Sequence, residues 1–179
     1  SDVLERYRRL LPMRVLTTER RIGYPGAVER LLREALDRTE YPKRDVAVTL
    51  QADFTENPDH IVSMINAIEG GADIVTGSVQ ANGIPLPRPV RLARWMAPLL
   101  LGKTFGGAPV SDPLSGFRAY RLIALKKALQ GFGDRPVLST DGWAANLELL
   151  GVVAPYARRI AETPVSLRYD VQVRPSPRP

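Results

Sequence analysis

The sequence predicts an α/β fold with a mostly parallel sheet flanked by helices. Short apolar, β-branched runs alternate with amphipathic helical segments along most of the chain. The chain has 179 residues, of which 44% are hydrophobic, and this suits a single domain with a substantial core. Because repeated strand and helix at this spacing build parallel sheets, we expect helices on both faces of one sheet.

Each expected element follows from a local pattern. Apolar residues at helical spacing predict helices over residues 2–11, 27–36, 58–69, 122–130 and 143–153. Short β-rich runs predict strands over residues 13–17, 45–50, 72–76 and 159–169, the last alternating as an edge or hairpin strand does. Glycines are expected to break the chain over residues 23–26 and to end a helix at residues 70–71. The proline-rich tail, residues 170–179, is expected to be flexible.

Composition excludes several kinds of site. The chain has no cysteine, which removes disulfides, thiolate metal sites and a cysteine nucleophile. Its one histidine, His60, lies in a predicted helix and is expected to be exposed there. A multi-histidine zinc site and a histidine-based catalytic triad are therefore excluded. A net charge of +6 and a pI of about 10.0 favour an anionic partner, either nucleotide, phospholipid or nucleic acid. Nucleic acid ranks last because no aromatic and basic binding motif is present.

The first candidate site follows a short, mostly apolar and β-branched run at residues 46–50, which predicts a buried strand. Gln51, Asp53, Thr55 and Glu56 lie between this strand and a helix start at residues 57–58. A carboxylate at the carboxyl end of a parallel strand lies where open α/β sheets bind ligands, and it can hold Mg²⁺ or Mn²⁺ against a diphosphate. These polar residues can also simply form the turn and cap the helix. On the local pattern alone, this second interpretation is favoured.

A long loop and a basic segment follow the third predicted helix. Residues 77–89 form a loop rich in glycine and proline, and loops of this length in compact domains are commonly functional. Residues 88–103 combine arginines with Trp95 and leucines at helical spacing. Such a helix either lies in a membrane interface or packs on the core with its arginines in solvent.

The second candidate site is the turn at residues 111–121. Its Ser115-Gly116 turn lies between Asp112 and Arg118, and it can present N–H groups and a guanidinium to phosphate oxygens. Its dipeptides are also ordinary turn formers. Asp141 precedes a predicted helix and is either a general base or an N-cap.

Together these segments resemble the family-two glycosyltransferases of the GT-A fold, especially the dolichyl- and polyprenyl-phosphate sugar synthases. Residues 51–58 resemble the family's Asp-x-Asp donor and metal motif, and residues 69–78 are similar to the strand and loop that follow it. The run Asp-Pro-Leu-Ser-Gly-Phe-Arg at residues 112–118 is the most specific match. Residues 162–165 resemble the strand that closes the catalytic domain.

The resemblance implies a cytoplasmic enzyme, peripheral at the inner face of the membrane, in one catalytic domain over residues 1–179. It would transfer a sugar, with inversion, from a nucleotide diphosphate sugar to a polyprenyl phosphate or a sugar acceptor. The implied metal, Mg²⁺ or Mn²⁺, would be held by Asp53 and Gln51. The remaining implied site residues are Asp112 and Ser115 on the acceptor side, Gly116 in substrate binding, Arg118 and Arg174 toward phosphate, and Asp141 as a base. For Arg174, a solvated arginine of the tail is the alternative.

The sequence departs from the family pattern in three places. Gln51 stands where the family usually has an aspartate, and Val79 where it often has an arginine. The family's first strand and acidic turn, which grip the nucleotide, have no counterpart ahead of Ser1. We therefore expect a GT-A-like sheet without its N-terminal strand. These departures favour an alternative function, a non-catalytic remnant or binding domain of the same fold.

Overall fold

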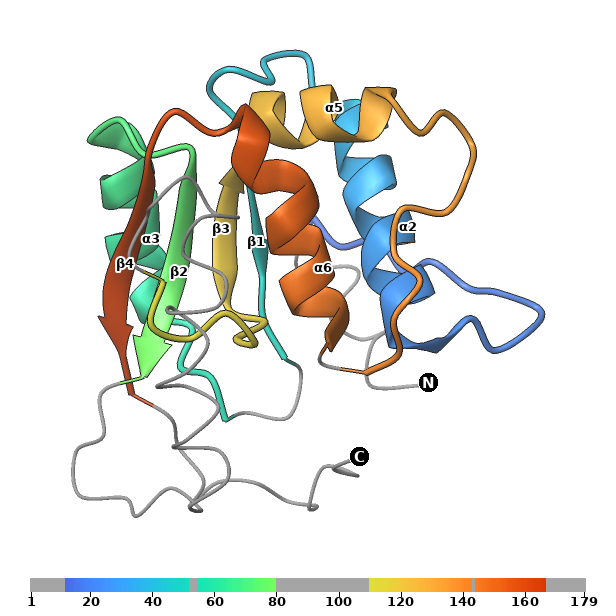
Figure 1. The fold of residues 1–179 in the computed structure, drawn as a ribbon, viewed down its shortest axis with the longest axis horizontal. Helices are drawn as coiled ribbons and strands as arrows, with labels where there is room; N and C mark the ends of the chain where they lie inside the picture. Colours follow the sequence, from blue (N-terminus) through green and yellow to red (C-terminus); the bar gives the residue numbers. More distant parts are fainter. Residues whose placement is uncertain (1–11, 52–54, 80–109, 143, 167–179) are drawn as a thin grey trace.

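The computed structural model describes residues 12–51, 55–79, 110–142 and 144–166 (Figure 1). The helices in this part of the chain are α2 (Gly23–Arg38), α3 (His60–Glu69), α5 (Leu122–Gln130), α6 (Ala144–Val153) and a 3-10 turn, η1 (Ala154–Tyr156). The strands are β1 (Val46–Thr49), β2 (Ile74–Val79), β3 (Arg118–Arg121) and β4 (Ile160–Val165). None of these helices is long and apolar enough to cross a bilayer.

The four described strands form one mixed sheet in the order β1-β3-β2-β4. β3 is antiparallel to both of its neighbours, and β2 is parallel to β4. Strands β1, β2 and β4 therefore point the same way, as a mostly parallel sheet requires, with β3 reversed among them. The strand predicted over residues 159–169 is an edge strand of the described sheet, but its partner is parallel, so it is not part of a hairpin.

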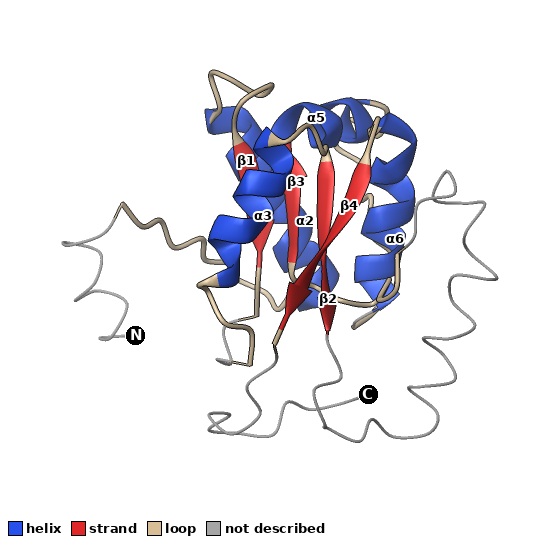
Figure 2. Ribbon diagram, turned by 90° about the vertical axis from the view of Figure 1, so that its left-hand side faces the viewer, coloured by secondary structure: helices blue, strands red, loops and turns tan. Residues whose placement is uncertain are grey.

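Helices cover both faces of the sheet, and Figure 2 looks onto it from the side of α3. Successive residues of a strand point to opposite faces of the sheet and therefore belong to different hydrophobic cores. Ile74 of β2 and Tyr120 of β3 pack with α2, α5 and α6, whereas their neighbours Val75 and Ala119 pack under α3. The predicted α/β class is therefore confirmed.

Helix boundaries differ from the predicted ones where local chemistry permits an earlier or later start. α2 begins at Gly23 instead of residue 27, since Pro25 suits the first turn of a helix and the predicted break is itself helical. α3 begins at His60, preceded by a turn in which the Asn57 side chain accepts a hydrogen bond from Asp59 N at 3.1 Å. The α3 helix ends at Gly70 and Gly71, the latter with φ +100°, as predicted.

Two strand predictions need correction. Residues 13–17 form no strand, since they pair with no other strand in the described residues, and Val15 is 45% exposed. The prediction was wrong because a short apolar run carries no information about a partner. β1 is half-buried instead of buried, because it lies at an edge of the described sheet.

Gly77→Ala tests how closely the sheet and α3 pack. A Cβ at Gly77 would lie 3.1 Å from Phe117 O and 3.2 Å from Met64 Cε, so we expect the free energy of unfolding to fall by about 1–3 kcal/mol in chemical denaturation. Gly151→Ala is the matched control: nothing lies within 4 Å of its Cβ position, and stability should rise by up to about 1 kcal/mol. A Gly77→Ala variant as stable as the parent would contradict this packing.

Candidate functional site

A row of polar side chains crosses the sheet at the carboxyl end of β1 and the middle of β2 and β4. The register places Thr49 opposite Arg118, Arg118 opposite Thr76, and Thr76 opposite Glu162. Two residues further back on each strand, the corresponding row is apolar and belongs to the core under α2, α5 and α6: Ala47, Tyr120, Ile74 and Ile160. The same face thus changes from apolar to polar toward the edge where α/β sheets bind ligands. We call Thr49, Arg118, Thr76 and Glu162 the polar row.

Arg118 lies inside the polar row and is only 1% exposed. Its Nη1 donates to the carbonyl of Asn146, and its Nη2 donates to the carbonyl of Pro113. The phenol of Tyr120 lies 3.4 Å from Nη1, and Nε is buried without a hydrogen-bond partner among the described residues. The guanidinium therefore ties the 110–117 loop to α6, and a direct contact between Arg118 and phosphate stays a prediction.

The 110–117 loop is folded by its own polar side chains. Asp112 accepts a hydrogen bond from Leu114 N at 3.3 Å, and Ser115 N donates to the carbonyl of Asp112. Phe117 N donates to the Ser115 hydroxyl at 3.3 Å. Asp112 and Ser115 therefore act as turn-forming residues in the structure, and Pro113 between them is buried.

Gly116 is required by the side chains that approach it. A Cβ there would lie 3.2 Å from both Tyr24 Oη and Asn146 Nδ2. These two side chains are themselves joined, since Tyr24 donates to Asn146 Oδ1 at 2.7 Å, and Asn146 Nδ2 donates to the carbonyl of Leu114 at 3.1 Å. Burial raises the pKa of the Tyr24 phenol, with the bond to Asn146 opposing, so the phenol remains a donor. A larger residue at position 116 would displace this support of the loop.

Glu162 anchors the start of the loop. Its Oε1 accepts hydrogen bonds from Ser111 N and, at 3.0 Å, from the Ser111 hydroxyl. Ser111 Oγ also lies 2.8 Å from the hydroxyl of Ser78, at the carboxyl end of β2. The far end is held by Thr49, whose hydroxyl donates to the carbonyl of Gly116 at 2.6 Å. Both ends of the loop are thus fastened to the polar row.

The predicted donor corner is described in part. Gln51 N donates to Glu56 Oε2 at 2.6 Å, and Thr55 and Glu56 are buried. Asp53 lies outside the described residues. In the described part of the chain, no group of three or more histidine, cysteine or acidic side chains is placed to hold a metal ion. The Asp53 and Gln51 metal site stays a prediction.

Asp141 is exposed in the turn ahead of α6, next to Gly142 with φ +63°. The segment before it is clamped by Glu148, which accepts hydrogen bonds from the backbone N–H and hydroxyl groups of Ser139 and Thr140 at 2.7–2.9 Å. Burial works to raise the pKa of Glu148, but these bonds outweigh it and lower the pKa to about 2. Arg174 and the predicted 88–103 helix lie outside the described residues.

Several residues of this site were not predicted from the sequence, among them Tyr24, Asn146, Glu162 and the two threonines of the polar row. The only local signal was Asn146, a lone amide among apolar residues of α6. His60, expected to be exposed, is partly buried and its Nε2 accepts a hydrogen bond from Ser166 N at 3.1 Å, next to the end of β4.

No protein-family model and no curated protein sequence matches this chain. Its fold is similar to that of glucosyl-3-phosphoglycerate synthase from Mycobacterium tuberculosis, whose crystal structure contains Mn²⁺, uridine-diphosphate-glucose and phosphoglyceric acid. The two share 20% identity at a TM-score of 0.50 over 88% of this chain, which spans about half (50%) of the matched structure's length. The likeness establishes a glycosyltransferase fold of the GT-A type, as predicted.

Asn146→Ala tests the support of the loop. It leaves the Leu114 carbonyl and the Tyr24 phenol without their partner, so we expect the free energy of unfolding to fall by about 1–3 kcal/mol. Asn66→Ala, at an exposed position of α3, is the control and should change stability by less than about 0.5 kcal/mol. Equal urea midpoints for the two variants would show that the Asn146 network does not hold the loop.

Glu148→Gln tests the clamp before Asp141. Because the pKa of Glu148 is lowered in the folded state, its contribution is complete above about pH 4.5 and is lost as the pH falls toward about 2. The variant should therefore be less stable than the parent at pH 7 and lose less stability across that window, measured as urea midpoint against pH. Glu69→Gln, at the exposed end of α3, should keep the parent's acid dependence. A Glu148→Gln variant with the parent's full acid dependence would contradict the clamp.

Proposed function

We propose that this domain binds a nucleotide diphosphate sugar at the carboxyl edge of its sheet and transfers the sugar, with inversion, to an acceptor. The observation that carries the proposal is the polar row with the 110–117 loop fastened across it, in a glycosyltransferase fold. The sheet face becomes polar at this row, and the side chains of Thr49, Arg118 and Glu162 are paired with the 110–117 loop, which holds the loop over the end of the sheet where α/β folds bind ligands. The similar synthase has Mn²⁺ and a nucleotide sugar bound, and this supports the assignment of ligand class.

The divalent ion, Mg²⁺ or Mn²⁺, would be held by Asp53 with Gln51. When bound, it neutralises the charge that develops on a leaving diphosphate. Gln51 brings an amide oxygen without charge, so the carboxylate of Asp53 dominates the affinity. The Gln51 N–H bond to Glu56 fixes the chain at the start of this corner.

The chain's own residues then divide into supports and contacts. Arg118 holds the loop through the carbonyls of Pro113 and Asn146. The loop in turn carries Asp112, Ser115 and Gly116, which shape the acceptor side, while Arg174 is assigned to phosphate on the strength of the family resemblance alone. A polyprenyl phosphate is the proposed acceptor, with the 88–103 segment as the proposed peripheral membrane contact.

A second candidate function is nucleotide binding without transfer. It is favoured by the described carboxylates of the site, since Glu56 and Glu162 already accept hydrogen bonds from backbone N–H groups. Gln51 and Val79 also depart from the family pattern. Metal-dependent binding of nucleotide in the absence of any sugar transfer would favour this candidate.

Asp53→Asn tests the donor site. Removing the charge should weaken Mn²⁺-dependent binding of uridine or guanosine diphosphate at least about tenfold in calorimetry, because hard divalent ions depend on carboxylate oxygen. Asp59→Asn, an exposed carboxylate at the start of α3, is the control and should bind like the parent. If both variants bind nucleotide equally well, Asp53 is only a turn residue.

Asp141→Asn tests the class of acceptor. A phosphate monoester has a second pKa of about 6, so it is already a dianion at neutral pH and needs no base, whereas a hydroxyl does. Transfer to a polyprenyl phosphate should therefore fall less than about tenfold in the variant, against roughly 10²-fold or more for loss of a general base. Loss of all turnover with an unchanged fold would instead indicate a hydroxyl acceptor.

A further inference from the structure

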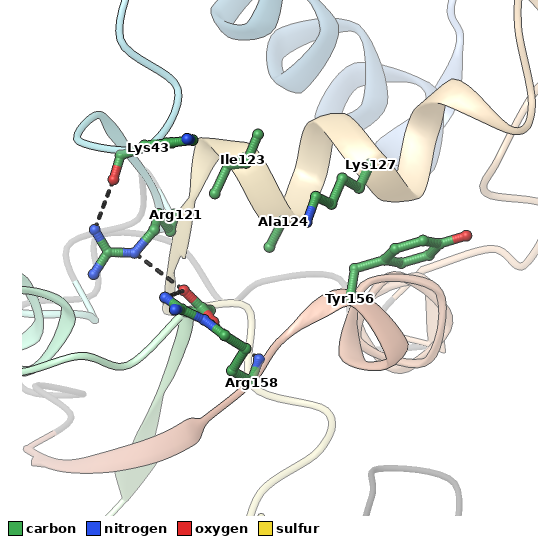
Figure 3. Close-up of a pocket in the computed structure, with 8 residues that line it drawn as sticks. Lys43, Arg121, Ile123, Ala124, Lys127, Tyr156 and Arg158 are labelled. Carbon is green, nitrogen blue, oxygen red and sulfur yellow. Dashed lines mark hydrogen bonds and ion pairs between the residues drawn. The ribbon is translucent and has the colours of Figure 1, made fainter.

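A polar cavity lies at the end of the sheet opposite to the polar row. It has a volume of about 320 Å³ and is bordered by the amino ends of β2 and β4, the end of β3 and the first turns of α5 (Figure 3). Its ionisable lining consists of Lys43, Asp73, Arg121, Lys127, Tyr156 and Arg158. The proposed sugar transfer uses none of these residues.

Asp73 and Arg121 lie at the bottom of this cavity, and their polar atoms are already hydrogen-bonded. Asp73 is 3% exposed, and its Oδ1 accepts a hydrogen bond from Arg121 Nε at 3.1 Å. The remaining nitrogens of Arg121 donate to backbone carbonyls, Nη1 to Lys43 at 2.9 Å and Nη2 to Ala72 at 3.1 Å. Burial works to raise the pKa of Asp73, but the hydrogen bonds from Arg158 outweigh it and the pKa is lowered, so Asp73 stays ionised. Asp73 and Arg121 are therefore committed to the fold.

The other cations keep donors for a ligand. Arg158 binds Asp73 through Nε at 3.1 Å and Nη2 at 3.3 Å, and its Nη1 has no hydrogen-bond partner among the described residues. The ammonium groups of Lys43 and Lys127 have no hydrogen bond or ion pair in the described part of the chain. In Figure 3 the Lys127 ammonium points from α5 toward the side on which Arg158 lies. With four cationic side chains and one carboxylate, the lining has a net charge of +3.

We propose that this cavity binds the phosphate or diphosphate group of a small phosphorylated molecule. Three separate elements supply the free donors: Lys43 precedes β1, Lys127 lies on α5, and Arg158 precedes β4. Cationic donors from several elements that line one cavity suit an anion with many acceptor oxygens. The cavity volume is within the range of small-molecule sites, and the ring of Tyr156 offers an apolar wall for the rest of the molecule.

This site is independent of the proposed donor site. It lies at the opposite ends of the strands, it contains no residue assigned to the metal, and its cations need no divalent ion to attract phosphate. Binding here should therefore persist in a chelator such as EDTA. It should also persist in Asp53→Asn, which separates failure of this proposal from failure of the proposed function.

The test is a titration of the whole chain with inorganic pyrophosphate in the presence of EDTA, in which binding is monitored by the NMR chemical shifts of the backbone amides. Shifts should centre on Asp73, Ala124 and Arg158, and Lys43→Gln/Lys127→Gln should weaken binding at least about tenfold. The matched control, Arg44→Gln/Lys126→Gln, removes the same charge from the neighbouring exposed positions and should weaken binding less than about threefold. All four positions are exposed, so none of these changes should disturb folding.

Three results would overturn the proposal. They are an absence of shifts up to millimolar pyrophosphate, shifts centred on residues 111–117 instead, and equal weakening by the two double variants. Equal weakening would show that pyrophosphate responds to the net charge of the surface and not to this cavity.

Discussion

The buried guanidinium of Arg118 is the interaction on which the carboxyl edge of the sheet depends. It is 1% exposed and held by two backbone carbonyls, one from the 110–117 loop and one from α6. A buried charge is costly unless it is hydrogen-bonded, and leaving a buried charged group without its carbonyl partners costs more than the roughly 1–3 kcal/mol of a neutral group. The loop and α6 therefore cannot move apart without exposing or stranding this charge.

The same logic applies at the other end of the same strand. β3 begins with Arg118 and ends with Arg121, and Arg121 also donates to backbone carbonyls, those of Lys43 and Ala72. The strand is reversed between β1 and β2, so each of its arginines reaches a different edge of the sheet. One edge is thereby shaped for the proposed sugar transfer, and the other frames the cationic cavity. Two arginines that look alike in sequence thus fix two separate surfaces.

Much of the fold could be predicted from periodicity. The predicted 122–130 helix has the bounds of α5, because its apolar spacing is regular and the helix is bounded by a strand and a glycine. The strand predicted over residues 13–17 is absent, because pairing is a long-range property.

The candidate site was predicted less completely. Asp112, Ser115, Gly116 and Arg118 were recognised as a motif, but the role of Arg118 depends on its burial against Asn146, which no local pattern shows. Glu162 and Tyr24 are linked to the site only by contacts between distant parts of the chain.

Arg118 orders the 110–117 loop through its bonds to the carbonyls of Pro113 and Asn146. Hydrogen exchange of the Arg118→Met variant tests this role most directly, since methionine keeps a long unbranched side chain but makes no hydrogen bond to the Pro113 or Asn146 carbonyls. We predict that the amides of Ser115 and Phe117 exchange at least about tenfold faster, while those between β2 and β4 keep their protection relative to global unfolding. Unchanged protection of Ser115 and Phe117 in a folded variant would contradict the claim.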